Sequence, residues 1–126
     1  LGQTDLSVTE ARRIVGESML IGKSTHNFKE LAKALAQKPD MVGVGPVFGT
    51  QSKRMASPKL GLDKARQLRE RAGVPAIAIG GITGENLPTL MSEGFTLYAL
   101  IGEVCQNEQP RKVIRRLKKI EREHMN

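Results

Sequence analysis

Short apolar segments alternate with helical patterns along most of this chain, and that alternation is the feature that most constrains the fold. Four segments have the length and composition of buried strands. They are residues 19–23, 41–48, 75–81 and 96–102. The middle two consist almost entirely of small or apolar residues, as strands do when helices cover both faces of a parallel sheet. Strands that alternate with helices imply right-handed crossovers, so the sequence predicts an α/β fold with a parallel sheet.

Five further segments have apolar residues at the spacing of amphipathic helices. They are residues 7–15, 27–36, 62–72, 85–93 and 110–123. In the first two, a capping residue stands three positions before a glutamate (Ser7 before Glu10, Asn27 before Glu30), which is typical of a capping box. The third and the fourth are each followed by a glycine, which suits the left-handed residue beyond a helix end.

The length of the chain leaves two architectures open. With 126 residues it fits one domain that can bury a core. A closed (β/α)8 barrel needs about 250 residues, or about 200 at the low end, so the chain is either a small open α/β sheet or about half of a barrel. No apolar stretch approaches the roughly 20 residues of a membrane helix, and no basic segment leads into an apolar core. We therefore expect no membrane partner and no signal peptide in these residues.

The formal net charge of +7 comes largely from the end of the chain. Seven basic residues against two acidic ones follow Gln109: Arg111, Lys112, Arg115, Arg116, Lys118, Lys119 and Arg122. An apolar stripe recurs among them at helical spacing: Val113, Ile114, Leu117 and Ile120. We interpret the basic side chains as the solvated outer face of a terminal helix. Nucleic-acid binding is the alternative, but three Phe and one Tyr are too few for a base-stacking platform, so we expect no nucleic-acid partner.

The single cysteine, Cys105, excludes an internal disulfide and suits a reducing compartment. We therefore expect a cytoplasmic protein. Cys105 lies where a strand or a helix begins in the predicted pattern, and we interpret it as a small apolar filler rather than a nucleophile.

Polar residues follow the first predicted strand, and in a parallel barrel the active site forms where strands end. Ser24, Thr25 and His26 lead into the Asn27 cap, and hydroxyl and amide groups at a helix start suit an anion. His26 is a candidate base for which no partner carboxylate is evident nearby in the sequence. Plain helix capping and a structural histidine are the alternatives.

A donor-rich segment follows the second predicted strand. It contains Thr50, Gln51, Ser52, Lys53 and Arg54, within a long polar stretch over 49–61. Two hydroxyls and two cations can converge on oxyanions from a loop that closes, which favours phosphate handling over a solvated surface loop.

Glycines follow the last two predicted strands. Gly80 and Gly81 would let the backbone approach a phosphate closely, with a helix N-terminus after them. If these are the final strands of a barrel, Gly81 and Gly102 lie at its usual phosphate site. Asp5, before the first helix, is a candidate oxygen ligand for Mg²⁺, although an aspartate at such a position is usually a cap.

Taken together, these motifs resemble those of the thiamine phosphate synthase family. The matching stretches are LGQTDL (1–6), IGKSTHN (21–27), GVGPVFGTQSK (43–53), AIAIGGIT (76–83) and EN (85–86). They occur in the family's order and nearly its spacing, over essentially the whole chain. The resemblance implies a TIM (β/α)8 barrel, of which residues 1–126 form a C-terminal half with about four strand–helix units. It also implies that the N-terminal half is absent from the chain.

The resemblance implies a Mg²⁺-dependent transferase of thiamine biosynthesis. Its members condense 4-amino-2-methyl-5-hydroxymethylpyrimidine diphosphate with 4-methyl-5-(2-phosphooxyethyl)thiazole, giving thiamine monophosphate and pyrophosphate. Asp5 would be one of two metal-binding aspartates, and Ser24 and Lys53 would hold the pyrimidine diphosphate and carry the catalysis. The thiazole phosphate would meet the following residues: Thr50, Gln51, Ser52, Gly81, Ile101 and Gly102. The partners implied are these two small molecules and the missing half-barrel, or further copies of the chain.

The chain departs from the family pattern at three places. Ile101 and Gly102 replace Val-Ser, the segment 95–97 replaces Ala-Asp-Gly, and Gly49 replaces proline. The family's N-terminal half, which carries the second metal ligand, is not in these residues, so we expect negligible turnover from them alone. Two alternatives stay open: a barrel that isomerises a thiazole carboxylate phosphate using His26, and a non-catalytic phosphate-binding module. The Thr-x-Ser-Lys pattern at 50–53 favours the synthase.

Overall fold

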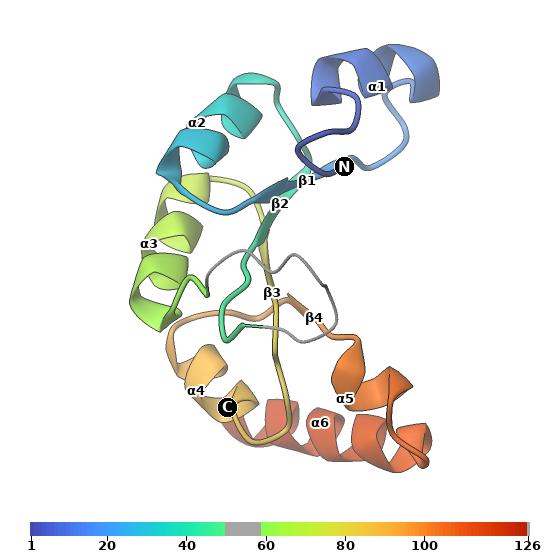
Figure 1. Cartoon of the computed structure of the whole chain (residues 1–126), viewed down its shortest axis with the longest axis vertical. Coiled ribbons are helices and arrows are strands. Elements are labelled where there is room, and N and C mark those ends of the chain that lie inside the picture. The colour runs from blue at the N-terminus through green and yellow to red at the C-terminus, as the bar shows by residue number, and fades with distance from the viewer. Residues whose placement is uncertain (50–58, 126) are drawn as a thin grey trace.

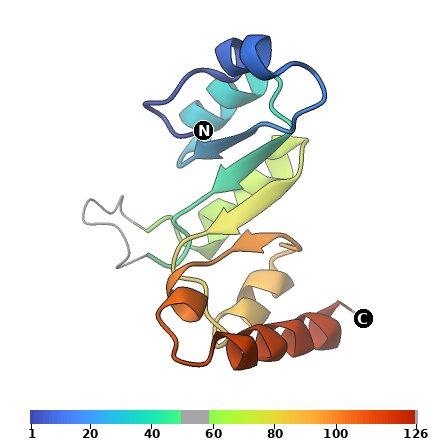
Figure 2. The same ribbon diagram turned by 90° about the vertical axis from the view of Figure 1, so that its right-hand side faces the viewer.

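The fold is a parallel α/β sheet with helices along its outer side. A computed structural model describes residues 1–49 and 59–125, and in these residues a four-stranded parallel sheet has the order β1-β2-β3-β4. The strands are β1 (Gly22–Thr25), β2 (Met41–Val44), β3 (Ala76–Ile79) and β4 (Tyr98–Ala99). Their arrowheads point to the same side of the molecule (Figure 2). The predicted α/β class and parallel pairing are therefore confirmed.

The helices are α1 (Val8–Val15), α2 (Phe28–Ala36), α3 (Leu62–Ala72), α4 (Leu87–Ser92), α5 (Gly102–Cys105) and α6 (Pro110–His124). In Figure 1, α2 and α3 flank the outer side of the curved sheet, with α1 at one end and α5 and α6 at the other. Ser7 and Glu10 form the predicted capping box, while Asn27 caps α2 by accepting the backbone N–H of Glu30 at 2.8 Å. Gly73 ends α3 in the left-handed conformation, as predicted.

All four strand predictions need correction at their ends. The middle two shorten from 41–48 and 75–81 to β2 and β3, and the first runs on through Ser24 and Thr25. The predicted strand 19–23 begins three residues later, because Met19 and Leu20 are exposed and the N–H of Ile21 donates to the Asp40 carboxylate at 2.7 Å. The predicted strand 96–102 shrinks to β4, because the chain turns into α5 at Gly102. Hydropathy marked these segments correctly as apolar, but it did not show where backbone pairing stops.

One face of the sheet carries the core. Side chains of β2 and β3 that point to the helices, such as Val42, Val44 and Ala78, are fully buried. Residues that alternate with them, such as Gly43 and Ile77, are half-buried, and Ile79 is 38% exposed. The helices of the described residues thus cover one face fully, whereas the sequence predicted two covered faces.

The N-terminal residue extends the sheet beyond β1. The Leu1 ammonium donates to Gly22 O at 2.8 Å, and the Ser24 N–H donates to Leu1 O at 2.9 Å. This is the pattern that one residue of a parallel strand makes with its neighbour. The edge of β1 is therefore already paired at Leu1.

The basic helix α6 lies against α4 as an outer element (Figure 1). Leu117 is buried and Val113 and Ile120 are half-buried, whereas the basic side chains are exposed, as the prediction of a solvated face requires. Ile114 was placed in the apolar stripe but is 42% exposed, so it lies off the buried face. Among the described residues, no helix has the length and apolar character needed to cross a membrane.

Candidate functional site

Ser24 lies at the carboxyl end of β1, on the face of the sheet that does not carry the helices. This face, which includes Gly43 and Ile77, is called the half-covered face. A Cβ at Gly43, on the neighbouring strand, would lie 3.8 Å from the Ser24 Oγ and 3.1 Å from the Ile79 Cδ1. Glycine at position 43 therefore leaves space beside the serine hydroxyl. The Ser24 carbonyl accepts the Gln3 side-chain amide at 2.6 Å, which ties the N-terminal turn to the same strand end.

Asp5 belongs to a turn that is fastened to β1. Its carboxylate accepts the Gly2 N–H at 2.6 Å, and Gly2 O accepts the Lys23 ammonium at 2.7 Å. Lys23 is only 8% exposed, and sequence analysis missed it, although a lysine inside a predicted strand was a visible signal. Within residues 1–49 and 59–125 no three His, Cys, Asp or Glu side chains gather as a metal site, so Asp5 offers a single carboxylate.

His26 has a carboxylate partner after all. Its Nδ1 lies 2.6 Å from the Glu30 Oε1, one helical turn further along the chain. The expectation that no carboxylate stands nearby was wrong, because the first turn of α2 brings Glu30 back beside His26, which directly precedes the Asn27 cap. Glu30 also accepts the Asn27 side-chain amide at 3.3 Å, so it orients both groups at the start of α2.

The loops after β2 and β3 pack backbone against backbone. The Val47 N–H donates to Ile79 O at 2.9 Å, and the Phe48 N–H donates to Gly80 O at 3.1 Å. A Cβ at Gly81 would lie 1.9 Å from Gly49 O, and Gly81 has a φ of +66°. Glycine at position 81 is thus needed for loop–loop contact, which is a different reason from the predicted approach to a phosphate.

Four predicted site residues, Thr50, Gln51, Ser52 and Lys53, lie outside the described residues. The segment's two flanks are described and lie together at the carboxyl edge. Leu60 N donates to Pro46 O at 2.6 Å and Gly61 N donates to Val47 O at 3.0 Å.

The loop after β3 is ordered by Asn86, which lies in the EN motif and had no role of its own in the sequence analysis. Asn86 accepts the Thr83 N–H at 2.8 Å and donates to Gly81 O, also at 2.8 Å. These two bonds fold residues 81–86 into a compact turn. Gly81 itself is exposed at the surface of this turn.

Ile101 and Gly102 follow β4, which pairs with β3 at Ile79 and Ala99. They therefore lie on the loop next to the one that carries Gly81. Ile101 is 57% exposed and Gly102 opens α5. The structure thus brings the glycine loops after β3 and β4 to one edge of the sheet.

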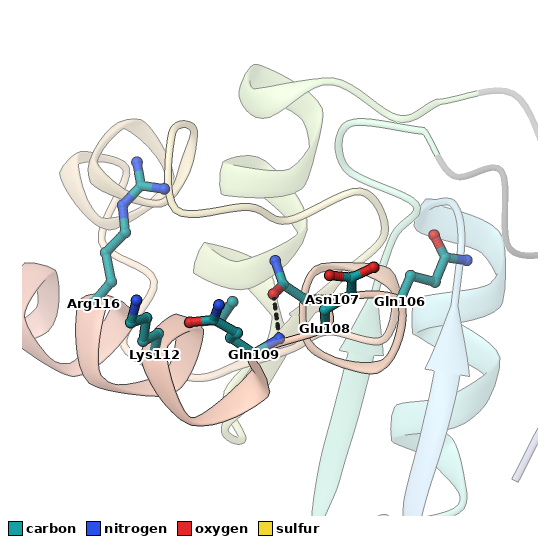
Figure 3. A pocket seen from close by; sticks show the side chains of 7 residues that line it. Gln106, Asn107, Glu108, Gln109, Lys112 and Arg116 are labelled. Atoms are coloured by element: carbon teal, nitrogen blue, oxygen red, sulfur yellow. Dashed lines mark hydrogen bonds between the residues drawn. The ribbon is translucent and has the colours of Figure 1, made fainter.

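Cys105 is the last residue of α5 and is exposed. The interpretation of Cys105 as a small apolar filler was wrong, because α5 is a single turn that leaves its C-terminal side chain outside the core. A hollow of about 470 Å³ lies just beyond, between the α5–α6 connection and the first turns of α6 (Figure 3). Gln106, Lys112 and Arg116 are among its lining residues, and it contains none of the predicted site residues.

Together, these features define a class: an α/β portion of a TIM (β/α)8 barrel whose polar and glycine-rich loops gather at the carboxyl edge of the sheet. The family model for thiamine monophosphate synthase matches residues 1–104. The chain belongs to the thiamine monophosphate synthase family.

Individual relatives agree with this assignment. The chain is 42% identical to a thiamine-phosphate synthase from Synechococcus sp. (strain WH7803) over 93% of its own length and 33% of the relative's. It is 38% identical to one from Methanocella arvoryzae, over 95% of its length and 57% of the relative's. A thiamine phosphate pyrophosphorylase structure from Pyrococcus furiosus superposes with a TM-score of 0.88 at 30% identity, over 100% of this chain and 59% of that one. The chain thus spans between about a third and three fifths of the length of these relatives.

Proposed function

We propose that this chain forms the phosphate-binding part of a thiamine phosphate synthase. The enzyme would join 4-amino-2-methyl-5-hydroxymethylpyrimidine diphosphate to 4-methyl-5-(2-phosphooxyethyl)thiazole, forming thiamine monophosphate and releasing pyrophosphate. The observation that carries the proposal is the juxtaposition of the Gly81 and Gly102 loops, in a chain of this family, at the edge where barrels bind phosphate.

The proposed thiazole-phosphate site is a cup of backbone and side-chain donors. Gly81, Ile101 and Gly102 would contribute backbone amides, and Thr50, Gln51 and Ser52 would contribute polar groups from the neighbouring segment. Backbone amides aimed at a phosphate are preorganised donors, so little reorganisation is needed when the anion arrives. We call Gly81, Ile101 and Gly102 the phosphate cup below.

The proposed pyrimidine diphosphate site uses Ser24 and Lys53. The Ser24 hydroxyl lies on the half-covered face beside Gly43, which supports its placement toward a ligand rather than toward the helices. As the bond between the pyrimidine methylene carbon and the diphosphate oxygen breaks, negative charge grows on pyrophosphate and Lys53 would stabilise it. The thiazole nitrogen then forms the new C–N bond, and no protein nucleophile is required.

The proposed Mg²⁺ would be shared between Asp5 and the diphosphate. Mg²⁺ typically keeps several waters and takes one or two protein carboxylates together with substrate phosphates. A single carboxylate on a turn held by Lys23 and Gln3 fits that role. When bound, the ion would neutralise charge on the departing pyrophosphate.

The half-covered face supports a proposal about domain organisation. We propose that residues 1–126 act as one portion of a barrel, closed by further strand–helix units or by another copy of the chain. The exposed Ile79 on the inner face and the strand-like pairing of Leu1 at the β1 edge both support it. For its location we propose the cytoplasm, which suits a chain with one exposed thiol.

Pyrophosphate release tests the proposal. The chain would be assayed alone and fused to the segment of the Methanocella arvoryzae relative that it does not match, with both substrates and Mg²⁺. We expect negligible turnover alone and clear release from the fusion, with the complete relative as the positive control. The fusion's Ser24→Ala variant should lose most of this activity, whereas Ser18→Ala, at an exposed site, should keep it.

The contact between His26 and Glu30 favours a second candidate function, because a carboxylate that orients an imidazole is a common acid–base arrangement. This candidate is the isomerisation of a thiazole carboxylate phosphate. A fusion that tautomerises the thiazole without releasing pyrophosphate would replace the synthase with this isomerase.

A further inference from the structure

A carboxylate joins the two loops that carry the phosphate cup. Glu103, on α5, accepts the backbone N–H of Gly84 at 3.1 Å through its Oε1. Gly84 lies three residues after Gly81, and Glu103 directly follows Gly102. One side chain thus spans from the loop after β4 to the loop after β3.

Gly84 is buried, so its N–H needs a partner. A buried amide without a hydrogen bond costs about 1–3 kcal/mol. The Glu103 carboxylate supplies that bond, and the loop's position therefore depends on a side chain from another element.

Arg116 holds Gly84 from a second direction. A Cβ at Gly84 would lie 3.1 Å from the Arg116 Cζ and 3.2 Å from its Nε, so the guanidinium packs on the glycine backbone. Figure 3 shows Arg116 extending from α6 on the same side of the helix as Lys112 and Gln109. The loop after β3 thus has a hydrogen-bond anchor from α5 and a packing contact from α6.

The charge of Glu103 argues against a direct role in anion binding. A carboxylate beside a phosphate repels it, more so in a partly buried setting than in water. A residue that served only to attract phosphate would not be acidic. The role that the structure supports for Glu103 is therefore its hydrogen bond to the Gly84 N–H. The neutral amide oxygen of a glutamine could accept the same hydrogen bond.

We propose that Glu103 is a positioning residue that sets the spacing between the Gly81 and Gly102 arms of the phosphate cup. The inference rests on the proposed function, since the cup is the site that the spacing serves. A positioning role predicts two opposite effects on phosphate affinity. The hydrogen bond that Glu103 accepts raises the affinity by holding the loops in place, whereas its negative charge lowers the affinity. Removing the Glu103 carboxylate oxygen that accepts the Gly84 N–H should let the two loops move apart. Removing only the negative charge should keep the loops in place and reduce the repulsion of phosphate.

The test compares three variants of the full chain, with inorganic phosphate as the probe. Glu103→Ala should weaken phosphate binding by roughly five- to tenfold, the equivalent of one hydrogen bond to the buried amide. Glu103→Gln should bind phosphate as tightly as the parent or more tightly. Glu108→Ala, which removes an equal charge from the α5–α6 connection, should match the parent. Binding would be followed through the amide NMR signals of Gly81, Gly84 and Gly102.

The outcomes distinguish the positioning role of Glu103 from the proposed synthase function on which it rests. If Glu103→Ala and Glu103→Gln weaken binding alike, or if neither changes it, the positioning role is overturned. Should the parent bind no phosphate and the fusion release no pyrophosphate, the proposed function fails and the cup with it. Circular dichroism melting of each variant shows whether Glu103→Ala keeps its fold. Should Glu103→Ala unfold, tighter phosphate binding by Glu103→Gln than by the parent supports the positioning role, and unchanged or weaker binding overturns it.

Discussion

The two ends of this sheet are built differently. At the N-terminal edge, α1 packs through a small separate cluster of Val8, Ala11 and Ile21, and large apolar side chains such as Ile14 and Leu20 are 74% and 70% exposed. At the C-terminal end, β4 and α6 join the main core, and the glycine loops are fastened by side chains from α5 and α6. The contrast teaches that one end presents uncovered apolar surface while the other is fitted around a candidate site.

The largest expected effect is a loss of stability at the C-terminal end of the sheet, where the loops after β2 and β3 pack together. Gly81→Ala would place a Cβ 1.9 Å from Gly49 O at a φ of +66°, so the loop after β2 or β3 must move. We expect the free energy of unfolding to fall by about 3 kcal/mol or more. Gly73→Ala is the matched control, because Gly73 has a φ of +67° with nothing within 4 Å of the added carbon. It should cost about 1 kcal/mol in urea unfolding, and equal losses in the two variants would contradict the loop contact.

The next largest effect comes from the same change, valine to alanine, in the main core and in the small cluster around α1. Val44 in the main core and Val8 in the small cluster are both fully buried. Val44→Ala should lower the free energy of unfolding by about 2–3 kcal/mol, whereas Val8→Ala should cost about 1 kcal/mol, since the smaller cluster can relax around the gap. Denaturant melts of both variants measure this. A larger loss for Val8→Ala would show that α1 is as firmly integrated as the rest.

Acid should loosen the N-terminal edge first. The hydrogen bond from Arg12, together with that from the Ile21 N–H, holds the pKa of Asp40 below its ordinary value. A depressed carboxyl pKa stabilises the fold above the unfolded value of about 3.9, and that contribution is lost as pH falls through the folded pKa. We expect amide exchange around Ile21 to accelerate below about pH 4. The Asp40→Asn variant should lack this step, and its persistence there would exclude Asp40 as the cause.

Alkali should loosen the other end. Burial, and then the hydrogen bond that the Tyr98 hydroxyl donates to Glu121, raise the pKa of Tyr98 and link β4 to α6. A raised phenol pKa gives stability that is complete below the unfolded value of about 10 and is lost as pH rises toward the folded value. Exchange in α6 should therefore rise above about pH 10. Tyr98→Phe should make α6 insensitive to alkali in this range, and a step that remained would point to another group.

Local signals predicted the helices well, because caps and apolar spacing are properties of neighbouring residues. Ser7 with Glu10 and the glycine after α3 gave ends that the structure confirms. The contact between His26 and Glu30 lies at the start of one of these helices: Glu30 is in the first turn of α2, and His26 directly precedes the Asn27 cap.

Longer-range features were out of reach of the sequence. Nothing near Glu103 in the chain indicates that its carboxylate meets Gly84, 19 residues earlier. Leu20 is 70% exposed because no element of residues 1–49 and 59–125 covers it, and the hydropathy of the sequence does not show which apolar residues are covered. For Gly81, the paired-glycine motif was visible, but its contact with Gly49 depends on how two loops pack.

The order of the strands has a consequence for how the chain folds. Each strand pairs with its neighbour along the chain, so the partners lie 19 residues apart between β1 and β2, 20 between β3 and β4, and 34 between β2 and β3. Closing the longest connection costs only about 0.5 kcal/mol more than closing the shortest, because loop entropy grows with the logarithm of length. Under the proposed function this longest connection carries the substrate-binding residues 50–53, and lengthening it further would add little entropic cost to assembly of the sheet.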